Sequence, residues 1–433
     1  MVIQLFHRHS IFTCAVLLAI VIAVTMAVNL NRGASAPASA RPVSTPTSRN
    51  AAAVSSPSAL TAAKLAGSQN EMRAVWVPYL SLDMSRESDQ SEQAFLKKFN
   101  VIVQNAKKCD LNTLIVQVRP FADALYQSSY FPWSHVVGGT QGVNPGYDPL
   151  ADMVKASHRA GMKIQAWVNP LRIQVSHTPS ILAEGNVYNT WKKDPQKAGW
   201  TVDYKDGKYL NPAYNGVRRL VADGVKEIAQ KYDVDGIQFD DYFYPTQDAA
   251  FDSTAYQAYC ASAQKTGTPM KLADWRRANI SALVSLAYQE IKSVKPSLPF
   301  GIAPQGNVQN DLAMGADVAA WCSASGYVDY ICPELYVNFE NPVLPFDAAA
   351  KKWRQMVTNS NIKLYYGIAV YKAGSDADSG TWKTSSGGIL AQQVEYGRKI
   401  SCDGFMFYSC DYLDKDQTKR EVQNVVEVLA HSS

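Results

Sequence analysis

Two short segments of the sequence contain carboxylate residues that could perform acid–base chemistry. Asp240 and Asp241 end the run Asp-Gly-Ile-Gln-Phe-Asp-Asp, and Glu334 lies in Cys-Pro-Glu-Leu-Tyr. Hydrolysis of a glycosidic bond requires two carboxyl groups, one as general acid and the other as nucleophile or base. We therefore predict Asp240, Glu334 and Asp241 as catalytic candidates. The sequence leaves open their separation, which distinguishes retaining from inverting chemistry.

From Met72 onward, short β-rich runs alternate with amphipathic stretches of helical length. Eight such βα units predict a single (β/α)8 TIM barrel. An open doubly wound sheet is disfavoured, because no G-x-G-x-x-G motif follows the first strand. The predicted strands are Arg73–Pro78, Thr113–Arg119, Lys163–Asn169, Gly236–Asp240, Pro299–Ala303, Val328–Leu335, Lys363–Val370 and Gly404–Ser409. The predicted helices include Ser91–Lys108, Pro149–Ala160, Tyr214–Lys231, Leu272–Val294, Gly388–Ile400 and Gln417–Leu429.

The connections between these elements are unequal in length. Pro120–Asp148, Pro170–Pro212 and Asp241–Ala273 follow strands and are long, whereas Ala160–Gly161 and Ser401–Asp403 precede strands and are short. Long βα loops meet at the carboxyl-terminal end of a barrel, where the active sites of such barrels lie. The catalytic candidates end predicted strands at this same face.

Side chains along a strand alternate between the barrel axis and the surrounding helices. Polar residues at the inward positions indicate a solvated pocket, although a buried hydrogen-bonded network would use the same residues. Arg119 is expected to point inward and hold a carboxylate ionised, or else to form a structural ion pair. Asp241 should turn away from Asp240 unless the strand bulges. Aromatic rings, which pack on sugar faces, crowd the long loops. The predicted substrate-binding residues are Arg119, Asp123, Gln165, Trp167, Asn169, Gln238, Tyr242 and Tyr336.

The composition is that of a globular protein with few charges. Of 433 residues, 47% are apolar and 18% charged, and 42 Lys and Arg against 38 Asp and Glu give a net charge of +4. This excess is too small to indicate nucleic-acid binding. The seven cysteines are scattered without metal-ligand spacing, so we predict no metal site and mostly buried thiols. The chemistry requires no cofactor.

The amino terminus contains an uncharged apolar run at Ile11–Val28, which is close to the roughly 20 residues that span a bilayer. We interpret residues 1–30 as a signal peptide or a membrane anchor. Residues 31–70 are rich in Ala, Ser, Pro and Thr and predict a flexible linker, and residues 71–433 form the barrel. Either interpretation places the barrel outside the cytoplasm, secreted or anchored to the membrane.

Several motifs resemble those of one bacterial family. They include Gln-Val-Arg-Pro at 117–120, Ala-Trp-Val-Asn-Pro at 166–170, Leu-Asn-Pro at 210–212 and Asp-Val-Asp-Gly-Ile-Gln-Phe-Asp-Asp-Tyr-Phe-Tyr-Pro at 233–245. From about Glu71 to the carboxyl terminus, the chain resembles the glycosyl-hydrolase-like family ten. This resemblance implies a (β/α)8 barrel and an extracytoplasmic enzyme that hydrolyses glycosidic bonds. Some members act on peptidoglycan glycan strands stripped of their peptides.

The sequence departs from the pattern of this family at two positions. Gln165 replaces the His expected before Ala-Trp, and Glu334 replaces the Gln of a Pro-Gln-x-Tyr motif. If relatives function without a carboxylate at the second position, Asp241, Asp123 and Asp83 remain open as partners of Asp240. Asp83 and Asp123 would equally serve as turn caps.

Three hypotheses for function follow from these observations. The first is a glycoside hydrolase that acts on a cell-wall glycan, such as peptidoglycan, or on another polysaccharide. The second is a non-catalytic glycan-binding barrel tethered at the cell surface, which the departures at Gln165 and Glu334 suggest. The third, a scaffold that binds no saccharide, is disfavoured by the polar barrel top.

Overall fold

The computed structural model describes residues 71–383 and 388–431. The predicted apolar segment and linker, residues 1–30 and 31–70, lie outside these described residues. Within the described ranges, no helix combines the length and apolar character needed to cross a bilayer. The six cysteines of the described part are all unpaired, and four of them are buried.

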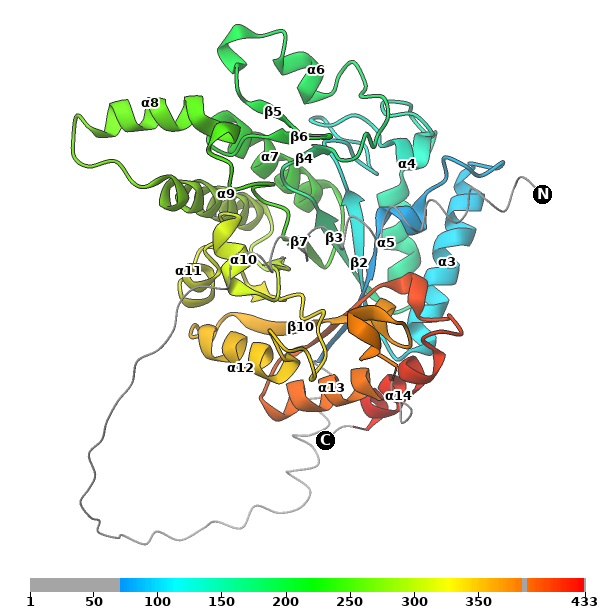
Figure 1. Cartoon of the computed structure of the whole chain (residues 1–433). Coiled ribbons are helices and arrows are strands. Elements are labelled where there is room, and N and C mark those ends of the chain that lie inside the picture. Colours follow the sequence, from blue (N-terminus) through cyan, green and yellow to red (C-terminus); the bar gives the residue numbers. More distant parts are fainter. Residues whose placement is uncertain (1–70, 384–387, 432–433) are drawn as a thin grey trace, which may run out of the picture. The chain divides into compact units, whose positions relative to one another are not determined.

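Eight parallel strands close into a barrel, which confirms the predicted fold (Figure 1). Each strand pairs with its neighbours in chain order, and the last pairs with the first. Runs of β-branched and aromatic residues, such as Thr-Leu-Ile-Val-Gln-Val-Arg in the second strand, favour this extended backbone. The strands are β1 (Met72–Val77), β2 (Thr113–Arg119), β3 (Lys163–Val168), β7 (Gly236–Phe239), β8 (Phe300–Ile302), β9 (Tyr330–Ile331), β10 (Lys363–Ala369) and β11 (Gly404–Tyr408).

Helices surround the strands, as Figure 1 shows. The first begins where the Ser91 hydroxyl accepts the Ala94 N–H, and it buries Phe95 and Phe99, one turn apart, against the barrel. The main helices are α3 (Glu92–Lys108), α5 (Pro149–Arg159), α7 (Asn215–Lys231), α9 (Leu272–Val294), α12 (Phe346–Met356), α13 (Ile389–Lys399) and α14 (Lys419–Ala430). Shorter helices after β2 and β8 are α4 (His135–Gly138), α10 (Val308–Ala313) and α11 (Val318–Ser323).

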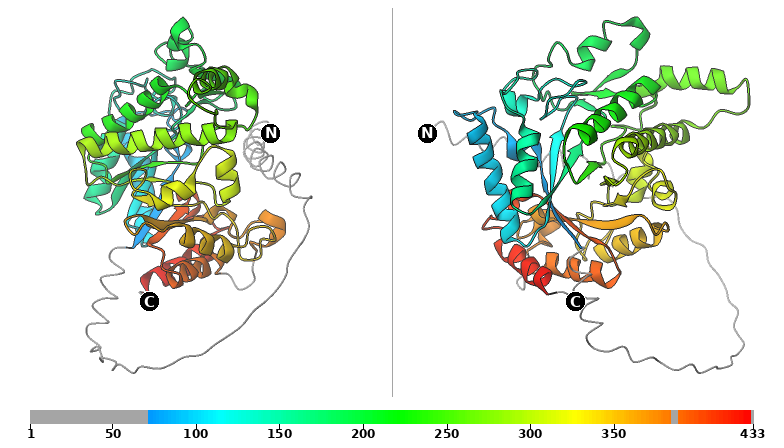
Figure 2. Two further views of the ribbon diagram at one scale, coloured as in Figure 1. Left: turned by 90° about the vertical axis from the view of Figure 1, so that its left-hand side faces the viewer. Right: turned by 180° about the vertical axis from the view of Figure 1, so that it is seen from behind.

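The long βα loops carry additional structure. The loop after β3 contains an antiparallel sheet of β4 (Arg172–Gln174), β6 (Gly207–Leu210) and β5 (Thr201–Tyr204), together with α6 (Val187–Trp191). The loop after β7 contains α8 (Ser253–Ala263). Figures 1 and 2 show α6 and α8 projecting outward from the barrel. These insertions follow the carboxyl-terminal ends of β3 and β7, the end predicted to form the site.

Inside the barrel, a hydrogen-bonded polar layer replaces part of the usual aliphatic core. Trp76 Nε1 donates to Gln238 Oε1 over 2.7 Å, and Gln238 Nε2 donates to the Tyr330 hydroxyl over 3.2 Å. The Tyr330 hydroxyl donates in turn to Gln165 Oε1 over 2.7 Å. This layer satisfies polar groups that would be costly to bury alone.

Aspartates at the amino-terminal end of the barrel tie adjacent strands together. Asp235 accepts the Ile164 N–H, Asp329 accepts the Phe300 N–H and Asp403 accepts the Leu364 N–H, at 2.7 to 2.9 Å. Asp235-Gly236 and Asp403-Gly404 therefore serve the structure at the end opposite to the catalytic candidates.

Two glycines make room for the polar layer. A Cβ at Gly301 would lie 2.2 Å from the Tyr330 ring, and one at Gly236 would lie 2.6 Å from Gln165 Cδ. We therefore expect Gly301→Ala to lower the free energy of unfolding by about 1–3 kcal/mol through overpacking, measured as a lower urea midpoint. Gly267→Ala is the control, because its Cβ would meet no atom within 4 Å. An unchanged midpoint for Gly301→Ala would contradict the tight packing of this layer.

Candidate active site

Asp240 follows the last residue of β7 and is only 3% exposed. Its carboxylate accepts hydrogen bonds from Trp167 Nε1 at 3.2 Å, from Asn169 Nδ2, and from the Tyr242 backbone N–H at 3.2 Å. Gln117 Nε2 donates to Asn169 Oδ1 over 2.6 Å and so orients that amide. The predicted site residues Trp167 and Asn169 thus converge on Asp240.

Burial and hydrogen bonding act in opposite directions on Asp240. Burial is the larger effect and raises the pKa of Asp240 to about 6, while the Arg172 charge and the N–H donors lower it. All three hydrogen-bond donors are N–H groups, which favour the ionised carboxylate. The Asp240 carboxylate is therefore held as an anion from mildly acidic pH upward.

Asp241 interacts electrostatically with both Asp240 and Glu334, although adjacent residues of a strand normally point in opposite directions. Burial and then the neighbouring Asp240 charge raise the pKa of Asp241 to about 7, whereas a hydrogen bond from the Gln305 side chain opposes this increase. β7 ends at Phe239, so strict alternation does not extend to these two residues. Ionisation of Asp240 therefore opposes ionisation of Asp241.

Glu334 lies beyond β9 and is held by both neighbouring strands. Its N–H donates to the Pro304 carbonyl at 2.9 Å, and it forms isolated bridges with Gln305 and Gly367. A Cβ at Gly367 would lie 3.2 Å from Glu334 Cα, so glycine permits this close approach. Burial, then the charges of Asp241 and Asp240, raise the pKa of Glu334 well above its usual range. Glu334 therefore favours its protonated form.

A group of tyrosines lies around Glu334. The rings of Tyr336, Tyr371 and Tyr408 have centroids 5.7 to 6.0 Å apart, and the Glu334 charge contributes to raising the pKa of each. The Tyr336 hydroxyl is buried without a hydrogen-bond partner among the described residues. Aromatic faces beside a carboxyl group suit a sugar ring, which presents C–H groups and hydroxyls.

Arg119 does not take the predicted inward direction, because β2 contains an irregularity. Gln117 pairs with Trp167, but Arg119 pairs with Val168, so one extra residue of β2 reverses the side-chain alternation. The Arg119 side chain is 1% exposed, and its guanidinium stacks on Phe131 at 4.4 Å. A Cβ at Gly224 of α7 would lie 2.5 Å from Arg119 Nη1. Arg119 therefore points toward the helices and away from the carboxyl groups.

Arg172, which we did not predict, supplies the positive charge. Its Nε donates to the Pro120 carbonyl at 2.7 Å, and its guanidinium lies between the rings of Phe121 (4.9 Å) and Tyr242 (5.3 Å). Its charge lowers the pKa values of Asp240 and Asp241. The available signal was its position just after Asn-Pro-Leu at the end of the third strand.

Four other residues considered in the sequence have their hydrogen-bond partners outside the carboxyl cluster. Asp123 is fully buried, accepts from Gln141 Nε2 at 3.1 Å and lies 3.6 Å from His135 Nδ1. Gln165 and Gln238 form hydrogen bonds with Tyr330 in the polar layer inside the barrel. Asp83 caps a turn by accepting the Ser85 N–H at 2.8 Å.

Tyr242 and Tyr336 remain as predicted substrate contacts. Tyr242 is 56% exposed, and Tyr336 is partly exposed within the tyrosine group. Asp311 of α10 is a fourth carboxyl group in this region, and its charge contributes to raising the pKa of Glu334. Nothing local in the sequence distinguishes Asp311, since it lies within a short helix of mixed polar and apolar residues. In the described ranges, no three His, Cys, Asp or Glu residues are arranged to hold a metal ion.

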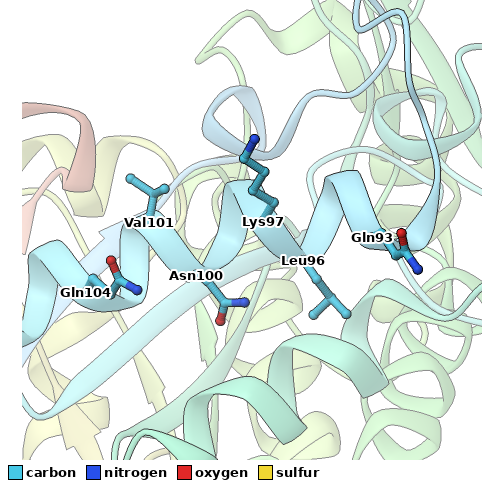
Figure 3. Close-up of a pocket in the computed structure, with 6 residues that line it drawn as sticks. All are labelled: Gln93, Leu96, Lys97, Asn100, Val101 and Gln104. Carbon is cyan, nitrogen blue, oxygen red and sulfur yellow. The ribbon is translucent and has the colours of Figure 1, made fainter.

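A separate hollow lies on the outer face of α3. All its lining residues come from this single helix, and Figure 3 shows them side by side along it. They include Leu96 and Lys97 but no converging set of acidic groups. Because a binding site requires polar groups that converge from several elements, we place the candidate active site at the carboxyl cluster.

The fold and the carboxyl cluster define a glycosidase-type barrel. The chain belongs to the family described as "Glycosyl hydrolase-like 10", which matches residues 71–383. This confirms the family resemblance drawn from the motifs.

Two similar proteins agree with this family, and two similar structures share the fold. Glycosyl hydrolase YngK of Bacillus subtilis (strain 168) is 32% identical over 373 residues, covering 81% of this chain and 70% of YngK. Glycosyl hydrolase DigH of Escherichia coli (strain K12) is 32% identical over 376 residues, covering 80% and 82%. The glycoside hydrolase domain of PgaB (BpsB) from Bordetella bronchiseptica has a TM-score of 0.54 and 12% identity, covering 83% of this chain and 99% of that domain. The catalytic domain of β-amylase from Paenibacillus polymyxa also has a TM-score of 0.54 and 12% identity, covering 83% and 97%.

Proposed function

We propose that this protein is an extracytoplasmic glycoside hydrolase that cleaves O-glycosidic bonds of a bacterial cell-wall glycan or another polysaccharide. The main support is the contrast between two carboxyl groups at one site. Asp240 receives three N–H donors, whereas Glu334 is surrounded by tyrosines and other acidic groups. Environments that separate two pKa values in this way assign an ionised and a protonated partner.

Each carboxyl group then has a defined role. Asp240, as the anion, acts on the anomeric carbon as nucleophile or activates the attacking water. Glu334, as the neutral acid, donates its proton to the leaving oxygen. Asp241 is the alternative acid, because its pKa of about 7 also keeps it partly protonated near neutral pH. Tyr242 and Tyr336 offer rings on which the sugar packs.

The proposed location rests on the amino-terminal sequence. An apolar run followed by an Ala-, Ser-, Pro- and Thr-rich stretch is typical of an export signal or anchor with a linker. A barrel held or released on that side of the membrane would meet wall glycans, including peptidoglycan strands. Detection of the protein in cytoplasmic fractions alone would contradict this location.

The proposed activity is tested by measuring released reducing ends. We would incubate the full chain with peptidoglycan strands stripped of peptides, intact peptidoglycan, chitin and cellulose. Release from at least one glycan is expected, and the anomeric configuration of the first product distinguishes retention from inversion. Binding to a glycan without any release would instead favour the non-catalytic barrel, for which the tyrosines around Glu334 would suffice.

The rate of hydrolysis is expected to depend on pH with two limbs. Activity should fall as the pH drops through about 6, because Asp240 becomes protonated, and should fall at higher pH as the acid loses its proton. Arg172→Gln removes a charge that lowers the pKa of Asp240, so the acidic limb should move to higher pH. Profiles of kcat/KM against pH measure this. An acidic limb that stays in place would show that Arg172 does not act on Asp240.

A further inference from the structure

Asp311 is a buried carboxyl group for which the proposed mechanism has no use. It is 2% exposed, its Oδ1 accepts the Gln305 backbone N–H at 2.9 Å, and its Oδ2 has no partner among the described residues. The titratable groups that face it are Asp241, Glu334 and the Cys322 thiol. Burial and then the Asp241 charge raise the pKa of Asp311 well above its usual range. An uncharged carboxylic acid fits these surroundings.

Gln305 connects Asp311 to both neighbouring carboxyl groups. It follows β8, its backbone bridges to Glu334, and its side chain lowers the pKa of Asp241. The hydrogen bond from the Gln305 N–H to Asp311 therefore fixes the residue that contacts Asp241 and Glu334. Asp311 lies on α10, so this hydrogen bond connects the Gln305 backbone to that short helix.

We propose that Asp311 is a positioning residue: its carboxyl oxygen accepts the Gln305 backbone N–H and so holds Gln305 beside Glu334, where the Gln305 amide acts on Asp241. The catalytic consequence rests on the proposed glycosidase function, whereas the positioning itself does not. Asp311 would touch no substrate, because its side chain is closed to solvent.

Two substitutions at Asp311 separate positioning from charge. Asn keeps an oxygen that accepts the Gln305 N–H, whereas Leu removes it. We expect Asp311→Asn to leave kcat within about twofold, and Asp311→Leu to lower kcat about tenfold with KM nearly unchanged, as for one lost hydrogen bond. Carbon-13 NMR titration of the carboxyl groups should show the Asp241 midpoint about 0.5–1 pH unit higher in Asp311→Leu and unmoved in Asp311→Asn. Gln309→Ala, an exposed position on the same helix, is the control.

The direction in which the Asp241 midpoint moves in the two variants tests the proposal. If Asp311 acted through a negative charge, both variants would lower the Asp241 midpoint, and the proposal would be overturned. An unmoved midpoint in Asp311→Leu would overturn it as well. Gln305→Leu should raise the Asp241 midpoint in the same way. This variant replaces Asp311→Leu in the test if Asp311→Leu does not fold. The titration needs no substrate, so expected midpoints in a protein that releases no reducing ends would reject the glycosidase function and retain the positioning role.

Discussion

Replacing Asp240 with asparagine is expected to lower kcat by about 1,000-fold or more, the equivalent of about 4 kcal/mol of transition-state stabilisation. Asparagine has nearly the same size, and its oxygen still accepts from Trp167 and Asn169, which hold Asp240 in the native protein. However, it provides no negative charge to stabilise the developing oxocarbenium ion or to activate water. Reducing-end release under saturating substrate measures the loss.

The control for this substitution is Asp233→Asn, near the opposite end of the same strand. Asp233 is exposed and pairs with Lys295 at 3.0 Å, so its loss should leave both activity and stability nearly unchanged. Circular dichroism and the urea midpoint would verify that Asp240→Asn remains folded. Undiminished turnover by a folded Asp240→Asn variant would remove Asp240 from the mechanism.

Replacing Glu334 with glutamine is expected to have the second largest effect. We expect kcat on a natural glycan to fall about 100-fold or more, because the neutral amide has no proton to donate to the leaving oxygen. An aryl glycoside with an acidic phenol as leaving group needs no such proton, so the loss should be much smaller on that substrate. Comparing kcat on the two substrates measures the contribution of the acid.

Asp241→Asn tests the rival assignment with the same two substrates. If Asp241 is the acid, its variant will show the dependence on leaving group and Glu334→Gln will not. That outcome would also fit the family resemblance, in which Gln occupies the position of Glu334. Because both residues are flanked by acidic groups that raise their pKa values, only this comparison separates them.

Local patterns in the sequence predicted the barrel because each element depends mainly on its own residues. All eight strands lie within one or a few residues of the predicted runs, except that the sixth is shorter, Tyr330–Ile331. Alternating side chains and buried β-branched residues produce strands wherever they occur. Asp240 was also predictable, since the end of a barrel strand is where catalytic groups emerge.

The sequence could not predict the direction of side chains that follow the irregularity in β2. Strict alternation placed Arg119 in the pocket, but the extra residue in β2 turned it toward α7, and no local pattern in the sequence marks that irregularity. Gln165 and Gln238 point inward as predicted, but their side chains form hydrogen bonds in the polar layer inside the barrel. Depth along the axis depends on the stagger between strands, which sequence alternation does not contain.

The sequence by itself therefore determined the fold class, the face that carries the site and the main acidic candidates. Only the tertiary structure decided which charges meet there. Arg172 comes from the inserted strand β4 after β3, and Asp311 comes from α10 after β8. Both interact electrostatically with the carboxyl cluster. Such meetings depend on distances between residues far apart in the chain, whereas strands and helices depend on neighbours along it.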